Sequence, residues 1–257
     1  MSLHEILEQL AAGNLTVEEA QSMLSIAGIA ALDGFAQIDT GRHARKGVPE
    51  VVFAPGKTPQ QLVEICKTMI EHTGRAIASG LDEERWAALE SSFGPRMAVA
   101  NRGAKMAVIR EPGREPLPTG GRLGILTAGT SDVPAAEQAR VIAEEMGCEV
   151  ITAYDVGIAG VHRLMEPLAR MIESRVAAVI VAAGMEGALP SVVAGLVAVP
   201  VIGLPTPTGY GLGGGGVTAL LSMLQSCCPG LVVVNIDNGI GAGATGALIA
   251  NGAATGT

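Results

Sequence analysis

The sequence predicts an α/β protein: a C-terminal parallel sheet with helices on both faces, a three-layer αβα domain, preceded by a smaller N-terminal α+β domain. Three observations lead to this fold class. From residue 122 onward, short apolar runs alternate with amphipathic segments of helical length. The apolar fraction is 48% but only 2% of residues are aromatic, as is typical of aliphatic strands buried on both faces. A segment rich in proline and glycine separates the two halves.

The N-terminal half is predicted to contain a helical pair followed by a mixture of strands and helices. Apolar residues recur at helical spacing in the first ten positions, and Thr16 with Glu19 forms a capping-box pattern that starts a second helix ending near Ser25. This pair is suited to packing or assembly. Strands are expected at 35–39, 50–54, 97–100 and 106–109, and helices at 59–71 and 82–91.

The domain boundary is predicted within EPGREPLPTGG, residues 111–121, because this composition favours turns over regular structure. We divide the chain into domains 1–115 and 116–257. Strands are then expected at 122–127, 149–153, 177–182, 200–204 and 231–236, and helices at 133–146, 162–173, 188–198, 217–226 and after Gly241. Five such βα units predict a parallel sheet with right-handed crossovers, which binds ligands at the carboxyl ends of its strands.

Charge and cysteine usage narrow the classes of partner. A net charge of −8 disfavours a nucleic-acid partner, since phosphate-backbone binding needs concentrated Lys and Arg. Four cysteines without CxxC spacing do not form a disulfide scaffold in a chain of 257 residues. The opening MSLHEILEQL lacks the basic start and apolar core of an export signal. We therefore expect a cytoplasmic protein.

A long uncharged stretch raises the alternative of a membrane span. Residues 187–236 contain no Asp, Glu, Lys, Arg or His. A spanning helix needs about 20 uninterrupted apolar residues, and Pro190, Pro200, Pro205, Pro207 and a run of four glycines interrupt this stretch. It therefore reads as buried sheet and helix, and no membrane partner is expected.

Polar residues in the loops after the predicted strands are the candidate site. Thr130, Ser131 and Asp132 join a strand to a helix, where backbone N–H groups and hydroxyls can hold a phosphate or ribose; helix capping is the alternative role for Ser131 and Asp132. His162 and Arg163 begin the second helix, where they can relay a proton and meet a phosphate, although a lone histidine is more often structural. Glu186 stands among glycines at a strand end, a position that packing does not explain.

Two further patterns are ambiguous. The glycines at 211, 213 and 216 match GxGxxG with Asp237 about 20 residues later, but a dinucleotide fingerprint follows its strand almost directly and this segment does not. A loop that covers the substrate explains these glycines better. Cys227 and Cys228 end a predicted helix, and no histidine nearby in the sequence activates them, so inert packing is the simpler interpretation.

Several long motifs together resemble one family. GTSD, GVHRL, VAAGMEGALPSVVAGLV, PVIGLPTPTGYG, LLSMLQSC and NIDNG are similar to the pyridinium-3,5-biscarboxylic acid mononucleotide synthase (LarB) family of nickel-pincer cofactor biosynthesis, over about residues 30–250. The C-terminal half is also similar to aminoimidazole ribonucleotide carboxylases and mutases. The mutase histidine of a His-Leu-Pro motif is replaced by Ala188, which disfavours the purine reaction.

The LarB resemblance implies a reaction. Nicotinic acid adenine dinucleotide would be carboxylated at pyridinium C5 with CO2, and its phosphoanhydride hydrolysed to release AMP. Cys227 aligns with the family's cysteine; its thiolate would add to C4 and make C5 nucleophilic. Glu186 is the candidate base for the C5 proton, with His162 as the second candidate. Mg²⁺ and no organic cofactor are expected, as is a homo-oligomer, because the related fold is commonly an octamer.

The resemblance also assigns substrate-binding residues. These are Gly184 and Met185 after one strand, Asp237 and Asn238 after another, and Asp39, Arg42, Arg45 and Lys57 in the N-terminal domain. The basic residues would meet the carboxylate and phosphates of the substrate as this domain closes over it. A solvated charged face is the alternative explanation of the N-terminal cluster.

Two other functions stay open at this point. A carboxyribonucleotide mutase would turn over an imidazole ribotide, and a non-catalytic nucleotide-sensing module would only bind its ligand. Incubation with the dinucleotide and bicarbonate separates the three hypotheses.

Overall fold

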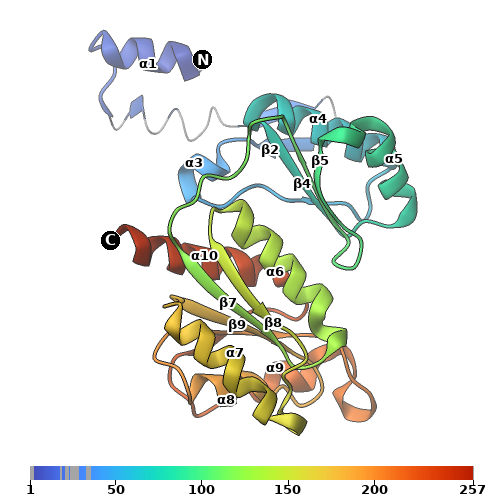
Figure 1. Ribbon diagram of the computed structural model, residues 1–257. Coiled ribbons are helices and arrows are strands. Elements are labelled where there is room, and N and C mark those ends of the chain that lie inside the picture. The colour runs from blue at the N-terminus through green and yellow to red at the C-terminus, as the bar shows by residue number, and fades with distance from the viewer. Residues whose placement is uncertain (1–2, 18, 21–22, 24–28, 33–35, 257) are drawn as a thin grey trace. The chain divides into compact units, whose positions relative to one another are not determined.

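The computed structural model describes residues 3–17, 19–20, 23, 29–32 and 36–256 (Figure 1). The chain divides into two compact units, Met1–Glu115 and Pro116–Thr257, and each is described by itself. Half of the expected helix at 16–25 lies outside the described residues. Its capping box is nevertheless formed: the Glu19 N–H donates to Thr16 Oγ1 (3.1 Å), and the Thr16 N–H donates to Glu19 Oε2 (2.9 Å).

The N-terminal unit is built around a four-stranded mixed sheet of order β3-β4-β6-β5. Trp86, Leu62 and Ile109 lie in the core that joins this sheet to its helices. A separate antiparallel pair, β1 with β2, precedes the sheet. The strands are β1 (Ile29–Leu32), β2 (Ala36–Asp39), β3 (Val52–Phe53), β4 (Arg75–Ser79), β5 (Met97–Asn101) and β6 (Met106–Arg110), and the helices are α1 (Leu3–Ala11), α3 (Arg42–Lys46), α4 (Pro59–Thr73) and α5 (Glu83–Phe93).

The expected mixture of strands and helices in this unit is confirmed, but three of its elements were not predicted. They are β1, α3 and β4. The sequence of β4, RAIAS, is short and contains two alanines and a serine, which carry a weak strand signal. Burial between β3 and β6 determines its conformation instead, since all its residues after Arg75 are buried.

The C-terminal unit confirms the predicted three-layer α/β domain. Its five strands are all parallel, in the order β11-β10-β9-β7-β8. Helices α6 and α10 cover one face, and α7, α8 and α9 cover the other (Figure 1). The strands are β7 (Arg122–Thr127), β8 (Glu149–Ala153), β9 (Ala178–Ala183), β10 (Val201–Pro205) and β11 (Leu231–Val233), and the helices are α6 (Val133–Glu145), α7 (His162–Glu173), α8 (Leu189–Ala194), α9 (Val217–Leu224) and α10 (Gly239–Thr255).

The ends of two elements differ from expectation. Helix α8 ends at Ala194, four residues early, because Pro200 disfavours helical backbone before it and Gly195 stabilises helix poorly. Strand β11 ends at Val233, although the Val234 N–H still donates to Gly203 O (3.0 Å).

Helices α6 and α10 approach each other closely on the sheet face they share. A Cβ atom on Gly243 would lie 2.4 Å from the Ala139 carbonyl oxygen, and one on Gly239 would lie 2.3 Å from that of Ala135. Only glycine permits this spacing. The pair forms a close-packed layer behind β7 and β9.

Candidate functional site

The strand order defines where the candidate site lies. Strands β7 and β9 are neighbours, and the chain leaves β7 for α6 on one face and β9 for α8 on the other. Such a switch point is where open parallel sheets bind ligands, beyond the carboxyl ends of the strands. The loops at 128–132 and 184–188 flank it, so they are the centre of the site.

In the loop after β7, the two hydroxyl residues and the aspartate differ in exposure to solvent. Thr130 and Ser131 are exposed, whereas Asp132 is only 3% exposed. Both oxygens of the Asp132 carboxylate have donors inside the protein: the Gly129 N–H reaches Oδ2 (2.9 Å), and the Thr206 hydroxyl reaches Oδ1 (2.5 Å). The hydroxyls can therefore face a ligand directly, while the carboxylate organises the loop.

In the loop after β9, a tight turn presents Glu186. The Gly187 N–H donates to Gly184 O (2.9 Å), and Met185 has a left-handed backbone (φ 52°), unusual for a residue with a side chain. Gly184 is packed so closely that a Cβ atom would lie 2.3 Å from Thr208 O. The Glu186 side chain is exposed at the tip of this turn, where it can meet a substrate.

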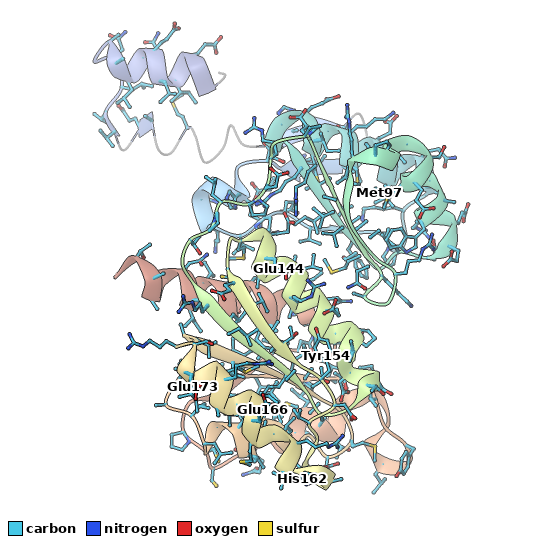
Figure 2. All side chains as sticks on the ribbon, in the orientation of Figure 1. Met97, Glu144, Tyr154, His162, Glu166 and Glu173 are labelled. Carbon is cyan, nitrogen blue, oxygen red and sulfur yellow. The ribbon has the colours of Figure 1, made fainter. Side chains whose placement is uncertain are left out.

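The loop after β8 carries an ion pair that the sequence analysis did not anticipate. Arg163 Nη1 lies 2.7 Å from Asp155 Oδ2, and the Asp155 N–H donates to Thr127 Oγ1 (3.0 Å) at the end of β7. Figure 2 shows His162 at the start of α7, and its side chain is exposed. Asp155 thus holds Arg163 near the predicted site. Asp155 also has a left-handed backbone (φ 59°), a feature that marks this position in the structure but cannot be seen in the sequence.

Of the two predicted binding residues after β11, Asn238 has a structural role and Asp237 is exposed at the surface. Asn238 caps α10, because its side chain accepts the Gly241 N–H (2.9 Å). Asp237 is exposed with a left-handed backbone (φ 57°), and its N–H donates to Pro205 O (2.8 Å). The side chain of Asp237 is thus presented to solvent beside the end of β10.

The glycine-rich segment does not form a dinucleotide fingerprint. Its glycines at 211, 213 and 216 belong to a 3₁₀ segment, Gly211–Gly216, that starts six residues after β10 ends. Leu212 and Tyr210 project from it and are largely exposed. The geometry agrees with a loop beside the switch point, since a Cβ on Gly209 would lie 2.6 Å from Gly213 O and 3.6 Å from Met185 Sδ.

Cys227 lies beyond the amino ends of the strands, opposite the end where the candidate site lies. Helix α9 runs back from the carboxyl ends, and residues 225–230 lead into β11. The Val201 N–H, at the first residue of β10, donates to Gly230 O (2.9 Å), three residues after Cys227. Five strand residues span about 17 Å, so Cys227 and Glu186 of one unit lie beyond opposite ends of the strands. Cys227 is exposed and Cys228 half-buried.

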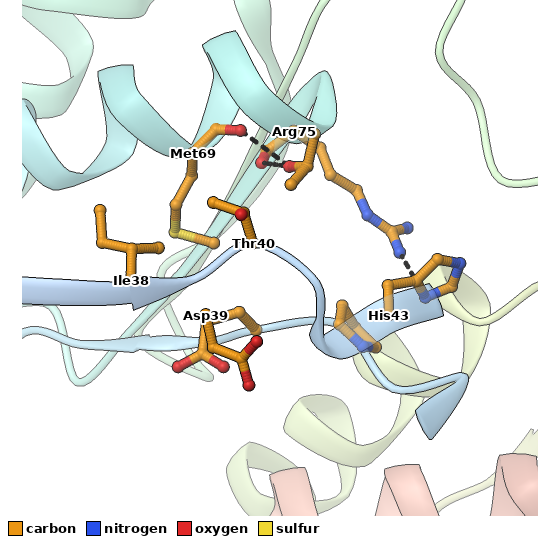
Figure 3. Close-up of a pocket in the computed structure, with 9 residues that line it drawn as sticks. Ile38, Asp39, Thr40, His43, Met69 and Arg75 are labelled. Atoms are coloured by element: carbon orange, nitrogen blue, oxygen red, sulfur yellow. Dashed lines mark hydrogen bonds between the residues drawn. The ribbon is translucent and has the colours of Figure 1, made fainter. Parts of the chain in front are cut away.

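The basic cluster of the N-terminal unit is largely paired with acids of the same unit. Arg42 bonds Glu50 (2.7 Å), Arg45 bonds Asp39 (2.6 Å), and Lys57 Nζ donates to Phe53 O (2.7 Å). Asp39 and Glu50 also line a pocket of about 60 Å³ (Figure 3).

His43 is the titratable ring of that pocket. Its Nδ1 lies 3.4 Å from a guanidinium nitrogen of Arg75, as Figure 3 shows. Burial, and then the positive charge of Arg75, lower the pKa of His43. The neutral ring is therefore favoured beside that cation.

Metal-binding and membrane-spanning features are not evident in the described part of the chain. Among those residues, no three His, Cys, Asp or Glu side chains are grouped to hold a metal ion. Nor is any helix within the described ranges long and apolar enough to cross a membrane.

Comparison with known proteins gives the same division of the chain. Residues 30–111 match the LarB/PurE-like N-terminal domain, and residues 122–255 match AIR carboxylase. The uncharacterized protein MJ0165 of Methanocaldococcus jannaschii is 42% identical over 257 residues, 97% of each chain. N5-carboxyaminoimidazole ribonucleotide mutase of Thermotoga maritima is 35% identical over 135 residues, 50% of this chain and 74% of the mutase. The Methanocaldococcus jannaschii mutase is 36% identical over 118 residues, 45% and 69% of the two chains.

Strand order and switch point thus define a doubly wound α/β protein, a class whose members bind ligands at the carboxyl ends of their strands. The chain belongs to the LarB/PurE-like family and combines its N-terminal domain with an AIR carboxylase domain. The resemblance found in the motifs is confirmed in both halves.

Proposed function

We propose that this protein converts nicotinic acid adenine dinucleotide, CO2 and water to pyridinium-3,5-biscarboxylic acid mononucleotide and AMP. The observation that carries the proposal is the pairing of domains in one chain. The mutase relatives match about half of this chain, whereas residues 30–111 match a LarB/PurE-like N-terminal domain. A LarB-type reaction accounts for both domains, with nucleotide as the substrate class.

The carboxylation requires a group that lends electrons to the ring and then leaves. Pyridinium C5 is electron-poor, so the Cys227 thiolate first adds to C4, and the resulting enamine attacks CO2 through C5. The Glu186 carboxylate then removes the C5 proton, the C4–S bond breaks, and the ring becomes aromatic again. The exposure of both side chains supports these roles. His162, exposed at the start of α7, is the alternative base.

The phosphoanhydride is assigned to the loops that offer cations, hydroxyls and backbone N–H groups. Thr130 and Ser131 at the approach to α6 face the nucleotide portion, and Arg163 faces a phosphate. Asp132 has both oxygens occupied, so a dedicated metal cage is not formed here. Mg²⁺ would be bound chiefly by the substrate phosphates, and it would stabilise the charge that develops during hydrolysis.

This assignment requires more than one copy of the chain. Cys227 and Glu186 act on adjacent ring atoms, yet within one unit they lie beyond opposite ends of the strands, as the bond from Val201 to Gly230 shows. Cys227 of one copy must therefore reach Glu186 of another. A stripe of exposed apolar residues on α9 leads toward Cys227 and supports such a contact: Val217, Leu221 and Leu224.

The decisive experiment is incubation of the purified protein with nicotinic acid adenine dinucleotide, bicarbonate as the source of CO2, and Mg²⁺. We expect AMP release together with a pyridine product heavier by one CO2. Turnover of N5-carboxyaminoimidazole ribonucleotide instead would establish the mutase alternative, which the C-terminal match favours. Binding without turnover of either substrate would indicate a nucleotide sensor.

A further inference from the structure

The loops of the candidate site converge on one buried hydroxyl, that of Thr206, directly after β10. Its side chain is 1% exposed. Its hydroxyl donates to Asp132 Oδ1 (2.5 Å), and its backbone N–H donates to Ala183 O (3.0 Å), the last residue of β9. Since β9 lies between β7 and β10, the Thr206–Asp132 bond joins the loops on either side of it.

Asp132 connects Thr206 to the loop that carries the hydroxyls of Thr130 and Ser131. Its second oxygen accepts the Gly129 N–H (2.9 Å), which closes the turn containing Thr130 and Ser131. Two donors among the described residues reach this carboxylate, which is 3% exposed, and it depends on each of them. The geometry of this turn therefore depends on Thr206.

Thr206 also limits the space available at the turn that presents Glu186. A Cβ atom on Gly184 would lie 2.8 Å from Thr206 Oγ1 and 2.3 Å from Thr208 O. The Met185 N–H donates to Thr208 O (2.7 Å). The same short segment after β10 therefore supports both loops of the switch point.

We propose that Thr206 is a positioning residue of the site: its hydroxyl, through Asp132, fixes the turn that presents Ser131 to the nucleotide. The nucleotide itself rests on the proposed function. Threonine is required as a donor, because an ionised carboxylate can only accept. Serine keeps that donor, whereas valine keeps the shape and leaves a buried acceptor without a partner.

The test combines ligand binding with local hydrogen exchange in the full-length protein. With AMP as the probe, Thr206→Val should weaken binding at least about tenfold, because the turn that presents Ser131 is no longer fixed, while Thr206→Ser should stay within about threefold. Amide exchange at Gly129 should accelerate in the valine variant and return to the wild-type rate in the serine variant. Ser79→Ala, which removes a buried hydroxyl that bonds Val52 O in the N-terminal unit, should change neither readout.

The outcomes separate this proposal from the function on which it rests. Wild-type AMP affinity and Gly129 exchange in Thr206→Val would overturn the positioning role, and so would equal losses in the serine and valine variants, which would indicate packing instead of a hydrogen bond. Wild-type protein that binds no AMP would also overturn it. Protein that binds AMP and shows the serine–valine difference, yet does not carboxylate the dinucleotide, would contradict only the proposed function.

Discussion

The four cysteines differ sharply in their surroundings. Burial raises the pKa of Cys66 to about 12 and that of Cys148 to about 11, so their reactive thiolates are scarce at pH 8. Cys227 and Cys228 are more accessible. We expect iodoacetamide at pH 8 to label the peptide with residues 227 and 228 first, and Cys66 and Cys148 only after unfolding, as peptide mass spectrometry will show. Early labelling of Cys66 would contradict the burial described here.

The covalent role of Cys227 can be tested on the adduct itself. Mass spectrometry of enzyme trapped with nicotinic acid adenine dinucleotide should show an adduct on the peptide containing both cysteines. Cys227→Ser should abolish it, because an alkoxide adds and departs poorly, and Cys228→Ala, the matched control, should keep it. Substantial carboxylation by Cys227→Ser would rule out the covalent mechanism.

Glu186 should matter for rate and not for stability. Its side chain is exposed on a turn whose contacts are made by backbone atoms. We expect Glu186→Gln to lower kcat by about 10²-fold or more and to change the free energy of unfolding by no more than about 0.5 kcal/mol. Glu166→Gln, an exposed acid on α7, is the control and should keep full activity. A stable Glu186→Gln enzyme with normal kcat would transfer the role of base to His162.

How far the sequence predicts this site depends on the kind of interaction involved. Ser131 and Glu186 were placed correctly in the loops after parallel strands, and Arg163 at the start of a helix, because the strand pattern determines those positions. The bond between Asp132 and Thr206 could not be predicted, since Thr206 is 74 positions from Asp132 and only the strand order brings them together. The position of Cys227 required the same tertiary information.

At the scale of elements, hydrophobic patterning succeeded where strands are buried on both faces. All six residues of β9 are buried, and its aliphatic sequence AVIVAA left little alternative. The N-terminal unit gave weaker signals: RAIAS in β4 carries no period of its own, and contact with neighbouring strands determines its conformation.

Helix α4 offers a test of local stabilisation. The Thr58 side chain accepts the Gln61 N–H (3.2 Å), and the Gln61 side chain accepts the Thr58 N–H (3.0 Å). Thr58→Ala should therefore lower the free energy of unfolding by about 1 kcal/mol. The sole tryptophan, Trp86, is buried in the same unit, so its fluorescence during urea unfolding measures this change.

The control for this helix is Thr68→Ala. The Thr68 hydroxyl only donates to Glu64 O of its own helix (3.1 Å), and its loss should change stability by less than about 0.5 kcal/mol. Equal effects of the two substitutions would mean that the capping box contributes nothing specific.

At the scale of the whole molecule, a shared site predicts complementation between subunits. Cys227→Ser and Glu186→Gln proteins should each be inactive. Unfolded together and refolded as a one-to-one mixture, they should recover about a quarter of wild-type activity, because a random quarter of sites receives both intact residues. Light scattering should show the same oligomer in all samples. Mixed oligomers of native size that stay inactive would show that each chain supplies both residues to its own site.

The close approach of α10 to α6 also has a consequence for biosynthesis. Strands β7, β8 and β9 are made well before Gly239 and Gly243, and α10 contacts β7, β9 and β10 as well as α6. Until residue 255 has been made, one aliphatic face of that sheet lacks its second helix. The segment Met1–Glu115 has all its parts much earlier and can fold during translation. The C-terminal unit is therefore exposed to aggregation during translation until α10 has been made.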